Sequence, residues 1–170
     1  MEEMFRLRPV EQEDSNFLHR LFNDQEVVKF WFVEPYYSVQ KIKNIVEESL
    51  KDRENRRFIF QNDKEKLGYI TLYNIEEVHG KAEFAIMIDP AQQGKGYAKV
   101  ATKLAMDYAF RVLNLRKLYL IVDATNTIAR KVYEKMGFEE EAVLNEEYFV
   151  DGEYHDAVHM SIFQRDYFKK

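Results

Sequence analysis

The sequence predicts one domain over residues 1–170 of the α/β (α+β) class, in which helices flank a central, mostly antiparallel sheet. Three observations support this prediction. The chain has 170 residues, which is enough to bury one hydrophobic core. Segments with apolar residues at helical spacing alternate along the chain with short β-prone runs. No repeat, linker or low-complexity stretch divides the sequence.

The N-terminal third is expected to hold one strand and two helices. Residues 5–8 alternate like a short strand that stops at Pro9. Asp14 or Ser15 can cap the first helix, and Ser38 can start the second. The stretch between them, residues 30–37, is dense in rings and too short for a helix. The expected apolar faces are Phe17, Leu18, Leu21 and Phe22 in the first helix, and Val39, Ile42, Val46 and Leu50 in the second.

The middle of the chain is expected to form strands and then a long helix. Short β-prone runs at residues 58–60, 67–73 and 82–88 are separated by the turn signals Asn62-Asp63 and His79-Gly80. Apolar spacing predicts a helix from Tyr97 to Leu113. Its buried stripe is expected to be Tyr97, Ala101, Leu104, Ala105, Tyr108 and Val112, with Lys99, Lys103, Asp107 and Arg111 facing away.

The C-terminal part predicts three more strands and one helix. Residues 117–122 are an almost continuous apolar run, which is typical of a buried strand. Residues 128–136 predict a helix, closed by Gly137 at the left-handed cap position. Asp151-Gly152 is a strong hairpin turn pair, so a strand is expected on each side of it.

Composition excludes several classes of protein. Lys and Arg total 25 against 30 Asp and Glu, for a net charge of −5, which argues against nucleic-acid binding and leaves cationic partners open. The absence of cysteine removes disulfides, thiolate metal sites and cysteine nucleophiles. Residues 1–5 lack the features of a signal peptide, and no apolar run approaches the roughly 20 residues that span a bilayer. We therefore expect a cytoplasmic protein with no membrane partner.

The segment Gln93-Gly94-Lys95-Gly96-Tyr97-Ala98 lies between a predicted strand and a predicted helix. Its glycines let the backbone approach a ligand, and backbone amides at a helix start favour a pyrophosphate. It lacks the Gly-Lys-Ser/Thr ending of a P-loop and the GxGxxG spacing of a dinucleotide site. By itself it equally fits a tight strand-to-helix turn.

Downstream residues favour a ligand site. After the glycine-rich segment come a helix, a buried strand, Asn126 and the pattern Tyr133-x-x-x-Gly137-Phe138. This order resembles the GNAT N-acetyltransferase superfamily. That family's acetyl-CoA signature, Gln/Arg-x-x-Gly-x-Gly/Ala, is matched here by Gln93, Gly96 and Ala98.

The resemblance covers nearly the whole chain, from Leu7 to Phe163, and implies the GNAT fold with acetyl-CoA as co-substrate. Three further phrases are similar to the bacterial spermidine N-acetyltransferase branch. They are Phe30-Trp31-Phe32-Val33-Glu34-Pro35-Tyr36, Arg56-Arg57-Phe58, and Ala105-Met106-Asp107-Tyr108 with Leu113-Asn114-Leu115-Arg116-Lys117-Leu118-Tyr119.

The implied reaction assigns two catalytic residues. A free alkylamine has a pKa of about 10.4 and is protonated at pH 7, so a base must remove a proton before it attacks. The resemblance implies Glu83 as this base; the alternative is a surface carboxylate paired with Lys81. Tyr133 matches the family's general-acid tyrosine, which protonates the departing CoA thiolate; the alternative is a core tyrosine.

The resemblance also implies the acetyl-CoA site. In this family the pantetheine arm lies like an extra strand along Ile86, Met87 and Ile88 and uses their backbone groups, so the side chains are free to serve the core. The pyrophosphate would lie at residues 93–98. Lys95 and Lys99 are candidates for the phosphates unless they are only solvated, and Asn126 either bonds the arm or caps the next helix.

In the polyamine branch, acidic residues bind the polycation between the first two helices, partly as a regulatory site between subunits. This chain keeps Glu34, Glu48 and Asp52 there. It has Val33, Tyr37, Lys41, Thr71 and Asn74 where that branch tends to carry acids, and Lys41 would repel a polyamine. Trp31, Tyr36 and Tyr37 offer cation–π contacts to an ammonium, or serve the core or a subunit interface.

The resulting hypothesis is direct acetyl transfer from acetyl-CoA to a primary amine, most simply spermidine or spermine. Two alternatives are acetylation of a protein N-terminus, as in ribosomal-protein acetyltransferases, and a non-catalytic acetyl-CoA or polyamine sensor. The resemblance implies a homo-oligomer, with a dodecamer as the candidate size. No metal site is expected, because His19, His79, His155 and His159 lack ligand spacing.

Overall fold

The computed structural model describes residues 4–169. Residues 1–3, part of the segment without signal-peptide features, lie outside this range, as does residue 170. The strands form a seven-stranded sheet in the order β1-β2-β3-β4-β5-β7-β6. All neighbours are antiparallel except β4 and β5, so the predicted fold class is confirmed. The strands are β1 (Arg6–Pro9), β2 (Arg56–Gln61), β3 (Lys66–Glu76), β4 (Lys81–Ile88), β5 (Lys117–Asp123), β6 (Glu139–Val150) and β7 (Glu153–Phe163).

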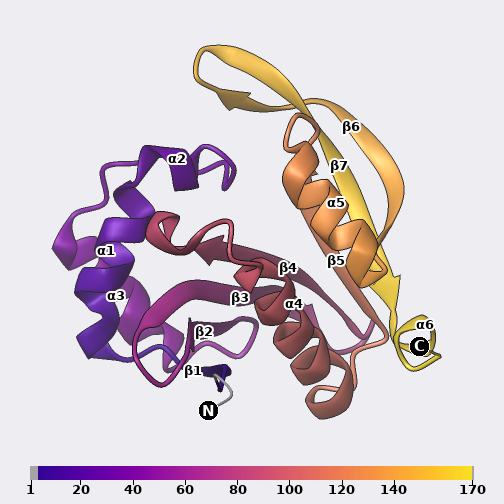
Figure 1. Ribbon diagram of the computed structural model, residues 1–170, viewed down its shortest axis with the longest axis horizontal. Helices are drawn as coiled ribbons and strands as arrows, with labels where there is room; N and C mark the ends of the chain where they lie inside the picture. The colour runs from indigo at the N-terminus through magenta and orange to yellow at the C-terminus, as the bar shows by residue number, and fades with distance from the viewer. Residues whose placement is uncertain (1–3, 170) are drawn as a thin grey trace.

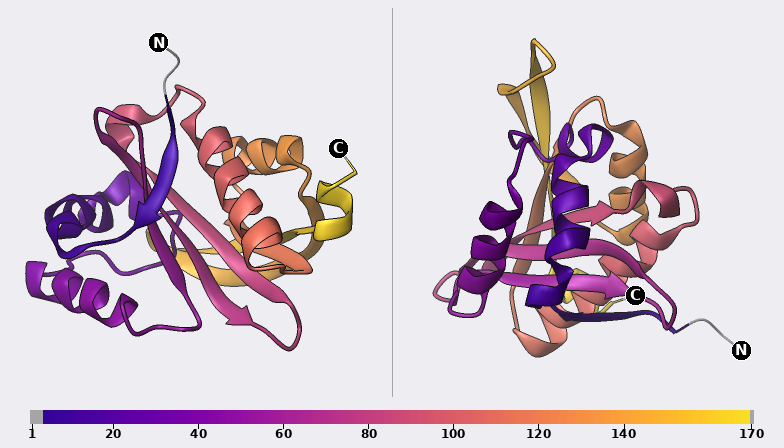
Figure 2. Two further views of the ribbon diagram at one scale, coloured as in Figure 1. Left: turned by 90° about the horizontal axis from the view of Figure 1, so that it is seen from below. Right: turned by 90° about the vertical axis from the view of Figure 1, so that its left-hand side faces the viewer.

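Helices cover both faces of the sheet. Helices α1 to α3 lie over one face of β2 to β4; α4 lies over the other face of these strands, and α5 lies beside it over β5 and β7 (Figures 1 and 2). No helix among residues 4–169 is long and apolar enough to cross a membrane. The helices are α1 (Ser15–Asn23), α2 (Gln25–Val28), α3 (Val39–Ser49), α4 (Tyr97–Asp107), α5 (Thr127–Met136) and α6 (Gln164–Tyr167).

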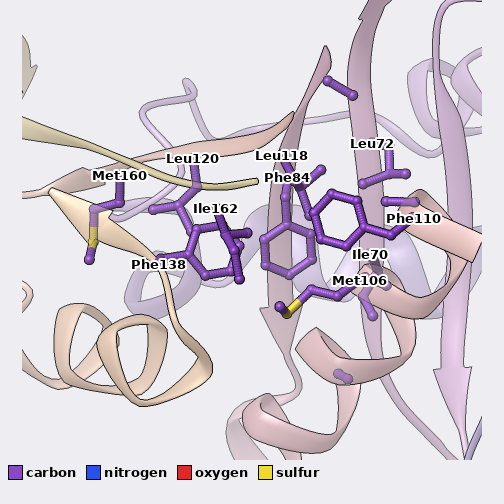
Figure 3. Close-up of a cluster of buried hydrophobic side chains, with 14 of the residues drawn as sticks. Ile70, Leu72, Phe84, Met106, Phe110, Leu118, Leu120, Phe138, Met160 and Ile162 are labelled. Carbon is purple, nitrogen blue, oxygen red and sulfur yellow. The ribbon is translucent and has the colours of Figure 1, made fainter. Parts of the chain in front are cut away.

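Each face of the sheet has its own hydrophobic core. Because side chains alternate along a strand, Ile70 and Leu72 of β3 point toward α4, whereas Tyr69 points toward α1. The core on the α4 side is the larger one and is drawn in Figure 3; in it the rings of Phe84 and Phe138 stack with centroids 6.5 Å apart. Strands β2 to β4 are thus covered by helices on both sides.

Helix α4 begins at Tyr97 as predicted, but its buried face differs from the expected stripe. The helix ends at Asp107 and continues as a π-helical turn, Tyr108–Val112. Such a turn holds an extra residue and rotates the positions that follow it. Val112, expected to be buried, is therefore 67% exposed. The buried residues are Ala101, Thr102, Ala105, Met106, Ala109 and Phe110.

Strands β4 and β5 pair only at their beginnings. The parallel ladder runs from Lys81, opposite Lys117, to Glu83, opposite Tyr119. Beyond Glu83 the strands diverge, so the remainder of β4 has an edge with no strand beside it (Figure 1). We call this divergence of the two strands the wedge.

Strands β6 and β7 form a long hairpin that projects from the body of the molecule (Figure 2, right). Asp151 and Gly152 both have positive φ at its tip, which confirms the predicted turn pair. The register shifts twice along β6, which bends the hairpin. Near the tip, the rings of Phe149 and Tyr154 pack together and remain exposed.

Candidate active site

The glycine-rich segment forms a loop that leads directly into α4. Gly94 and Gly96 have φ of +79° and +80°, a backbone conformation that other residues adopt only with strain. Gly96 is the N-cap residue of α4. The loop therefore places the first-turn amides and the positive end of an 11-residue helix at its mouth, an arrangement that binds phosphate groups.

Side chains around the loop have distinct positions. The ammonium of Lys95 donates to Gln92 Oε1 at 2.7 Å, so this lysine is held at the base of the loop. The ring of Tyr97 packs on Phe5 in the larger core. Lys99 is exposed and lines a cavity of about 320 Å³ between α4 and α6. At the mouth of the loop, the groups presented are therefore mainly those of the backbone.

The backbone of β4 presents alternate residues to its two sides. The amide of Asp89 donates to the carbonyl of Leu67 at 2.9 Å, which makes these two residues a hydrogen-bonded pair of the β3–β4 ladder. Because such pairs alternate, the backbone of Met87 also faces β3, whereas the backbones of Ile86 and Ile88 face the wedge. The backbone groups of Met87, which were expected to bond the pantetheine arm, instead bond β3, so this expectation is wrong.

Glu83 lies where β4 and β5 begin to diverge. Its side chain is half-buried, and this burial raises the pKa of its carboxyl group. Lys81, the alternative partner, instead binds Glu76 at 3.2 Å. No cation within residues 4–169 forms an ion pair with Glu83, so the alternative of a neutralised surface carboxylate is wrong.

Tyr133 lies on α5 with its ring in the larger core. It meets the rings of Phe84 and Phe138 at centroid distances of 6.2 and 5.9 Å. Burial raises the pKa of its hydroxyl well above the usual value. The phenol therefore stays protonated at neutral pH and can donate a proton to a stronger base.

Two tyrosines that the sequence did not indicate lie within electrostatic reach of Glu83. They are Tyr119 on β5 and Tyr148 on β6; burial, and then the charge of Glu83, raise the pKa of each phenol. The ring of Tyr148 stacks on Phe32 with centroids 3.6 Å apart. The sequence signals Phe32 through the density of rings in residues 30–37. It gives no signal for Tyr148, because no residue near Tyr148 in the sequence indicates that it packs against that stretch.

Asn126 caps α5. Its side-chain oxygen accepts from the amide of Ala129 at 3.2 Å, which fits the capping interpretation. Just before it, buried Asp123 is 2.6 Å from Nδ1 of His155. Glu141 engages His159 instead, and no group of potential ligands within residues 4–169 is arranged to hold a metal.

The three carboxylates that were expected to bind the substrate do not lie together in one site. Asp52 is bound by Arg57 at 2.9 Å and accepts from Asn55; these bonds outweigh the effect of burial, so the pKa of Asp52 is lowered. Glu48 lines a depression of about 220 Å³ on α3 that includes neither Asp52 nor Glu34. Glu34 is exposed in the stretch of residues 30–37 that follows α2.

The rings of that stretch also separate. Tyr36 is 82% exposed and has a positive φ, so it is presented to solvent. Tyr37 already has a cation over its ring, since the ammonium of Lys41 lies 4.0 Å from the centroid. Trp31 packs inward and donates its indole N–H to the carbonyl of Ile86 at 2.8 Å. Of these rings, Tyr36 remains the most open to a ligand.

The fold, with its glycine loop before α4, its wedge beside β4 and its buried tyrosine on α5, is that of an acyl-CoA-dependent transferase. The family model of the acetyltransferase (GNAT) domain matches residues 5–139. The chain therefore belongs to the GNAT acetyltransferase family.

Within this family the chain is most informatively compared with spermidine acetyltransferases. It is 46% identical to spermidine N(1)-acetyltransferase of Escherichia coli K12 over 162 residues, covering 95% of this chain and 87% of the relative. It is 38% identical to the Vibrio cholerae enzyme of the same name over 171 residues, covering 100% and 99%. A crystal structure of the Vibrio cholerae enzyme with CoA and spermine superposes with a TM-score of 0.94, at 39% identity over 96% of this chain and 98% of that one.

Proposed function

We propose that this chain transfers the acetyl group of acetyl-CoA to a primary amine of spermidine or spermine. The observation that carries the proposal is the position of Glu83, an unpaired half-buried carboxylate at the narrow end of the wedge whose other end adjoins the phosphate-binding loop. Similarity to relatives that act on spermidine supports the choice of amine.

The amine needs a base before it can attack. An alkylammonium has no lone pair, and its pKa is about 10.4 in water. Glu83 accepts the proton directly or through water, and the pKa of its carboxyl is raised by burial, which makes it a stronger base than an exposed glutamate. Tyr119 and Tyr148 lie close enough to this carboxylate for its charge to raise the pKa of each phenol.

The transfer itself is a direct displacement. The amine lone pair forms a bond to the thioester carbonyl carbon, and the carbon–sulfur bond breaks as the tetrahedral intermediate collapses. The CoA thiolate takes its proton from the hydroxyl of Tyr133. Glu83 already holds the proton removed from the ammonium before the attack, and the second proton, which the nitrogen loses to become an amide, restores the hydroxyl of Tyr133. The chain contains no cysteine to form an acetyl-cysteine intermediate.

The other assigned residues take supporting roles in this proposal. The arm of acetyl-CoA pairs with backbone groups of Ile86 and Ile88, and its pyrophosphate lies on the loop, residues 93–98. Glu34 and Tyr36 offer a carboxylate and a ring to the distant ammonium of the polyamine. Glu48 stays a weaker candidate, and Asp52 contributes through the structure it holds with Arg57.

We extend the proposal to the whole molecule. Residues 1–170 act as one catalytic domain, supported by the continuous seven-stranded sheet. A homo-oligomer is supported by similarity to a dodecameric Vibrio cholerae spermidine N-acetyltransferase structure, with a TM-score of 0.86 at 38% identity over 96% of this chain and 95% of that one. A cytoplasmic location agrees with the use of an intracellular acyl donor, and cell fractionation tests it.

A substrate panel tests the function. CoA release is measured with acetyl-CoA and, separately, spermidine, spermine, diamines and N-terminal peptides. We expect release that depends on spermidine or spermine, with a product one acetyl group heavier. Turnover of peptides alone would make the chain an N-terminal acetyltransferase. Tight acetyl-CoA binding without turnover of any amine would make it a sensor.

A further inference from the structure

The carbonyl of Ile86 is the feature from which the inference starts. Backbone alternation along β4 directs this carbonyl, together with the backbone groups of Ile88, into the wedge rather than toward β3. β5 no longer pairs with β4 at this point. A ligand that extends along β4 would therefore find Ile86 and Ile88 as its successive partners, one on every second residue.

One of these acceptors already has a donor from the protein itself. Trp31 Nε1 donates to the carbonyl of Ile86 at 2.8 Å. The carbonyl of Ile88 is held only by a long 3.5 Å contact from the side chain of Gln93. Along this edge the carbonyl of Ile86 is therefore already occupied. The carbonyl of Ile88, nearer to the phosphate-binding loop, remains accessible to a ligand.

The indole of Trp31 is fixed by its surroundings. Its ring packs against Phe22, Tyr69 and Tyr73 at centroid distances of 6.0, 5.8 and 6.3 Å. These rings belong to the α1 side of the sheet, opposite to the α4 side from which the phosphate-binding loop approaches. Trp31 therefore reaches the edge of β4 from the face where the amine is expected.

The residue after Trp31 adds a second attachment. Phe32 has a φ of +55°, a strained conformation for a bulky side chain that persists only where the surroundings enforce it. Its ring stacks on Tyr148, with the ring planes 6° apart. Residues 31 and 32 thus connect β4 to the β6–β7 hairpin beside Glu83.

We propose that Trp31 is a positioning residue that, by occupying the Ile86 carbonyl, fixes how far the acyl-CoA arm extends along β4. The inference rests on the proposed function, because it assumes that acyl-CoA lies in the wedge. With Ile86 O closed, the arm takes Ile88 O as its last carbonyl partner, and the thioester stops at one defined distance from Glu83 and Tyr133. Orientation of this kind is worth large factors in rate, and a misplacement of about 1 Å can cost about 100-fold.

This role differs from a cation–π contact between Trp31 and the substrate. An indole that binds the amine through its ring would affect the KM for the amine. An indole that acts through its N–H would affect kcat and the discrimination between acyl groups of different length. The two roles therefore predict different kinetic parameters.

The substitution Trp31→Phe separates them, because it keeps a ring and removes the N–H donor. We expect kcat with acetyl-CoA to fall about 10- to 100-fold while the KM for spermidine stays near the wild-type value. We also expect propionyl-CoA to gain relative to acetyl-CoA. A raised KM for spermidine with an unchanged kcat, or kinetics indistinguishable from wild type, would overturn the proposal. Phe30→Leu, which changes the neighbouring exposed ring, should leave these parameters unchanged.

A second measurement does not depend on turnover. Trp31 is the single tryptophan of the chain, so the emission of the unmodified protein reports on it alone. Titration with CoA should shift this emission saturably, with the midpoint that calorimetry gives for CoA binding. An unshifted emission at saturating CoA would contradict the placement of Trp31 beside the arm. If wild-type protein turns over no amine, the proposed function fails, yet this titration still decides the inference.

Discussion

Burial raises the pKa of both Glu83 and Tyr133, which makes the carboxylate a stronger base and keeps the phenol protonated, although it also makes the phenol a weaker acid. A carboxyl with a raised pKa is a stronger base when ionised. A phenol with a raised pKa remains a protonated donor at neutral pH. Enzymes obtain acid and base catalysis at one pH by placing titratable groups in such environments.

Tyr133→Phe removes the proposed general acid and retains the ring that contacts Phe84 and Phe138. We expect kcat to fall about 100-fold or more, because general acid catalysis contributes roughly 10²–10⁴-fold. The affinity for acetyl-CoA, measured by calorimetry, should change little. Tyr108→Phe is the matched control, since its ring packs on Phe58 away from the wedge. An unchanged kcat in Tyr133→Phe would remove this residue as the acid.

Glu83→Gln tests the base through the pH dependence of the rate. In the wild type, kcat/KM should rise with pH as Glu83 ionises, with a midpoint above the ordinary glutamate value of 4.5 because burial raises its pKa. Glutamine does not ionise, so this part of the profile should flatten and the rate should be lower. A pH profile identical to that of the wild type would count against the assignment.

Asp14 provides a test of stability at a distance from the site. Its side chain has no solvent exposure and is bound by Arg8 and Lys66. Burial alone would raise its pKa, but these hydrogen bonds outweigh it and lower the pKa to about 2. Its contribution is therefore present above the ordinary value of 3.8 and is lost as pH falls toward 2.

Asp14→Asn should lower the free energy of unfolding in urea at pH 7 by about 2–3 kcal/mol, because it weakens hydrogen bonds to two cations. The deficit should shrink as the pH is lowered from 4 toward 2, where the wild-type carboxyl becomes protonated. Asp63→Asn, which removes an exposed ion pair with Arg6 at 3.6 Å, should have almost no effect. Equal effects of the two substitutions would show that the bonds of Asp14 to Arg8 and Lys66 do not stabilise the fold more than an exposed ion pair does.

At the scale of the elements, the loop of residues 93–98 and helix α4 form the proposed binding site for the pyrophosphate of acetyl-CoA. Gly96→Ala places a Cβ in open space, so its cost comes from the φ of +80° alone. That conformation costs an ordinary residue roughly 1–2 kcal/mol, which predicts an increase of about 5- to 30-fold in the KM for acetyl-CoA.

Gly152→Ala is the control for this change, because Gly152 also has a positive φ and open space but lies at the hairpin tip. It should leave the KM for acetyl-CoA unchanged. A similar rise in both variants would mean that the effect is one of general stability rather than of the loop.

Most elements could be predicted from sequence because their signals are local. Ser38 accepts from Lys41 at the start of α3, Gly137 closes α5 with a φ of +100°, and Asp151 begins the hairpin turn. The short helix α2 was missed although Asp24 caps it, because four residues leave no periodicity to detect. The exposure of Val112 could not be predicted, because the spacing of apolar residues does not reveal a π-helical turn.

The parts of the candidate site that lie in a sequence motif could be predicted. The parts that depend on hydrogen bonds between distant segments could not. The glycine loop and Tyr133 stand in a fixed order along the chain. The orientation of Met87 depends on which β3–β4 pairs are hydrogen-bonded, and the bond from Trp31 to Ile86 joins residues 55 positions apart. Neither can be derived from the spacing of residues within one segment.

At the scale of the whole molecule, the sheet separates two approaches to one reaction centre. In the proposed function, acetyl-CoA binds from the side of α4, where the loop lies, and the amine enters from the side of α1 to α3. The approaches meet only in the wedge, where β4 and β5 part at Glu83. Both substrates must therefore be present together for the amine to reach the thioester.

Initial rates measured while both acetyl-CoA and spermidine are varied test this central claim most directly. Direct transfer in a ternary complex predicts double-reciprocal lines that intersect, with no CoA release before the amine is added. Parallel lines, or a burst of CoA from the enzyme and acetyl-CoA alone, would reveal an acetyl-enzyme intermediate and contradict the account.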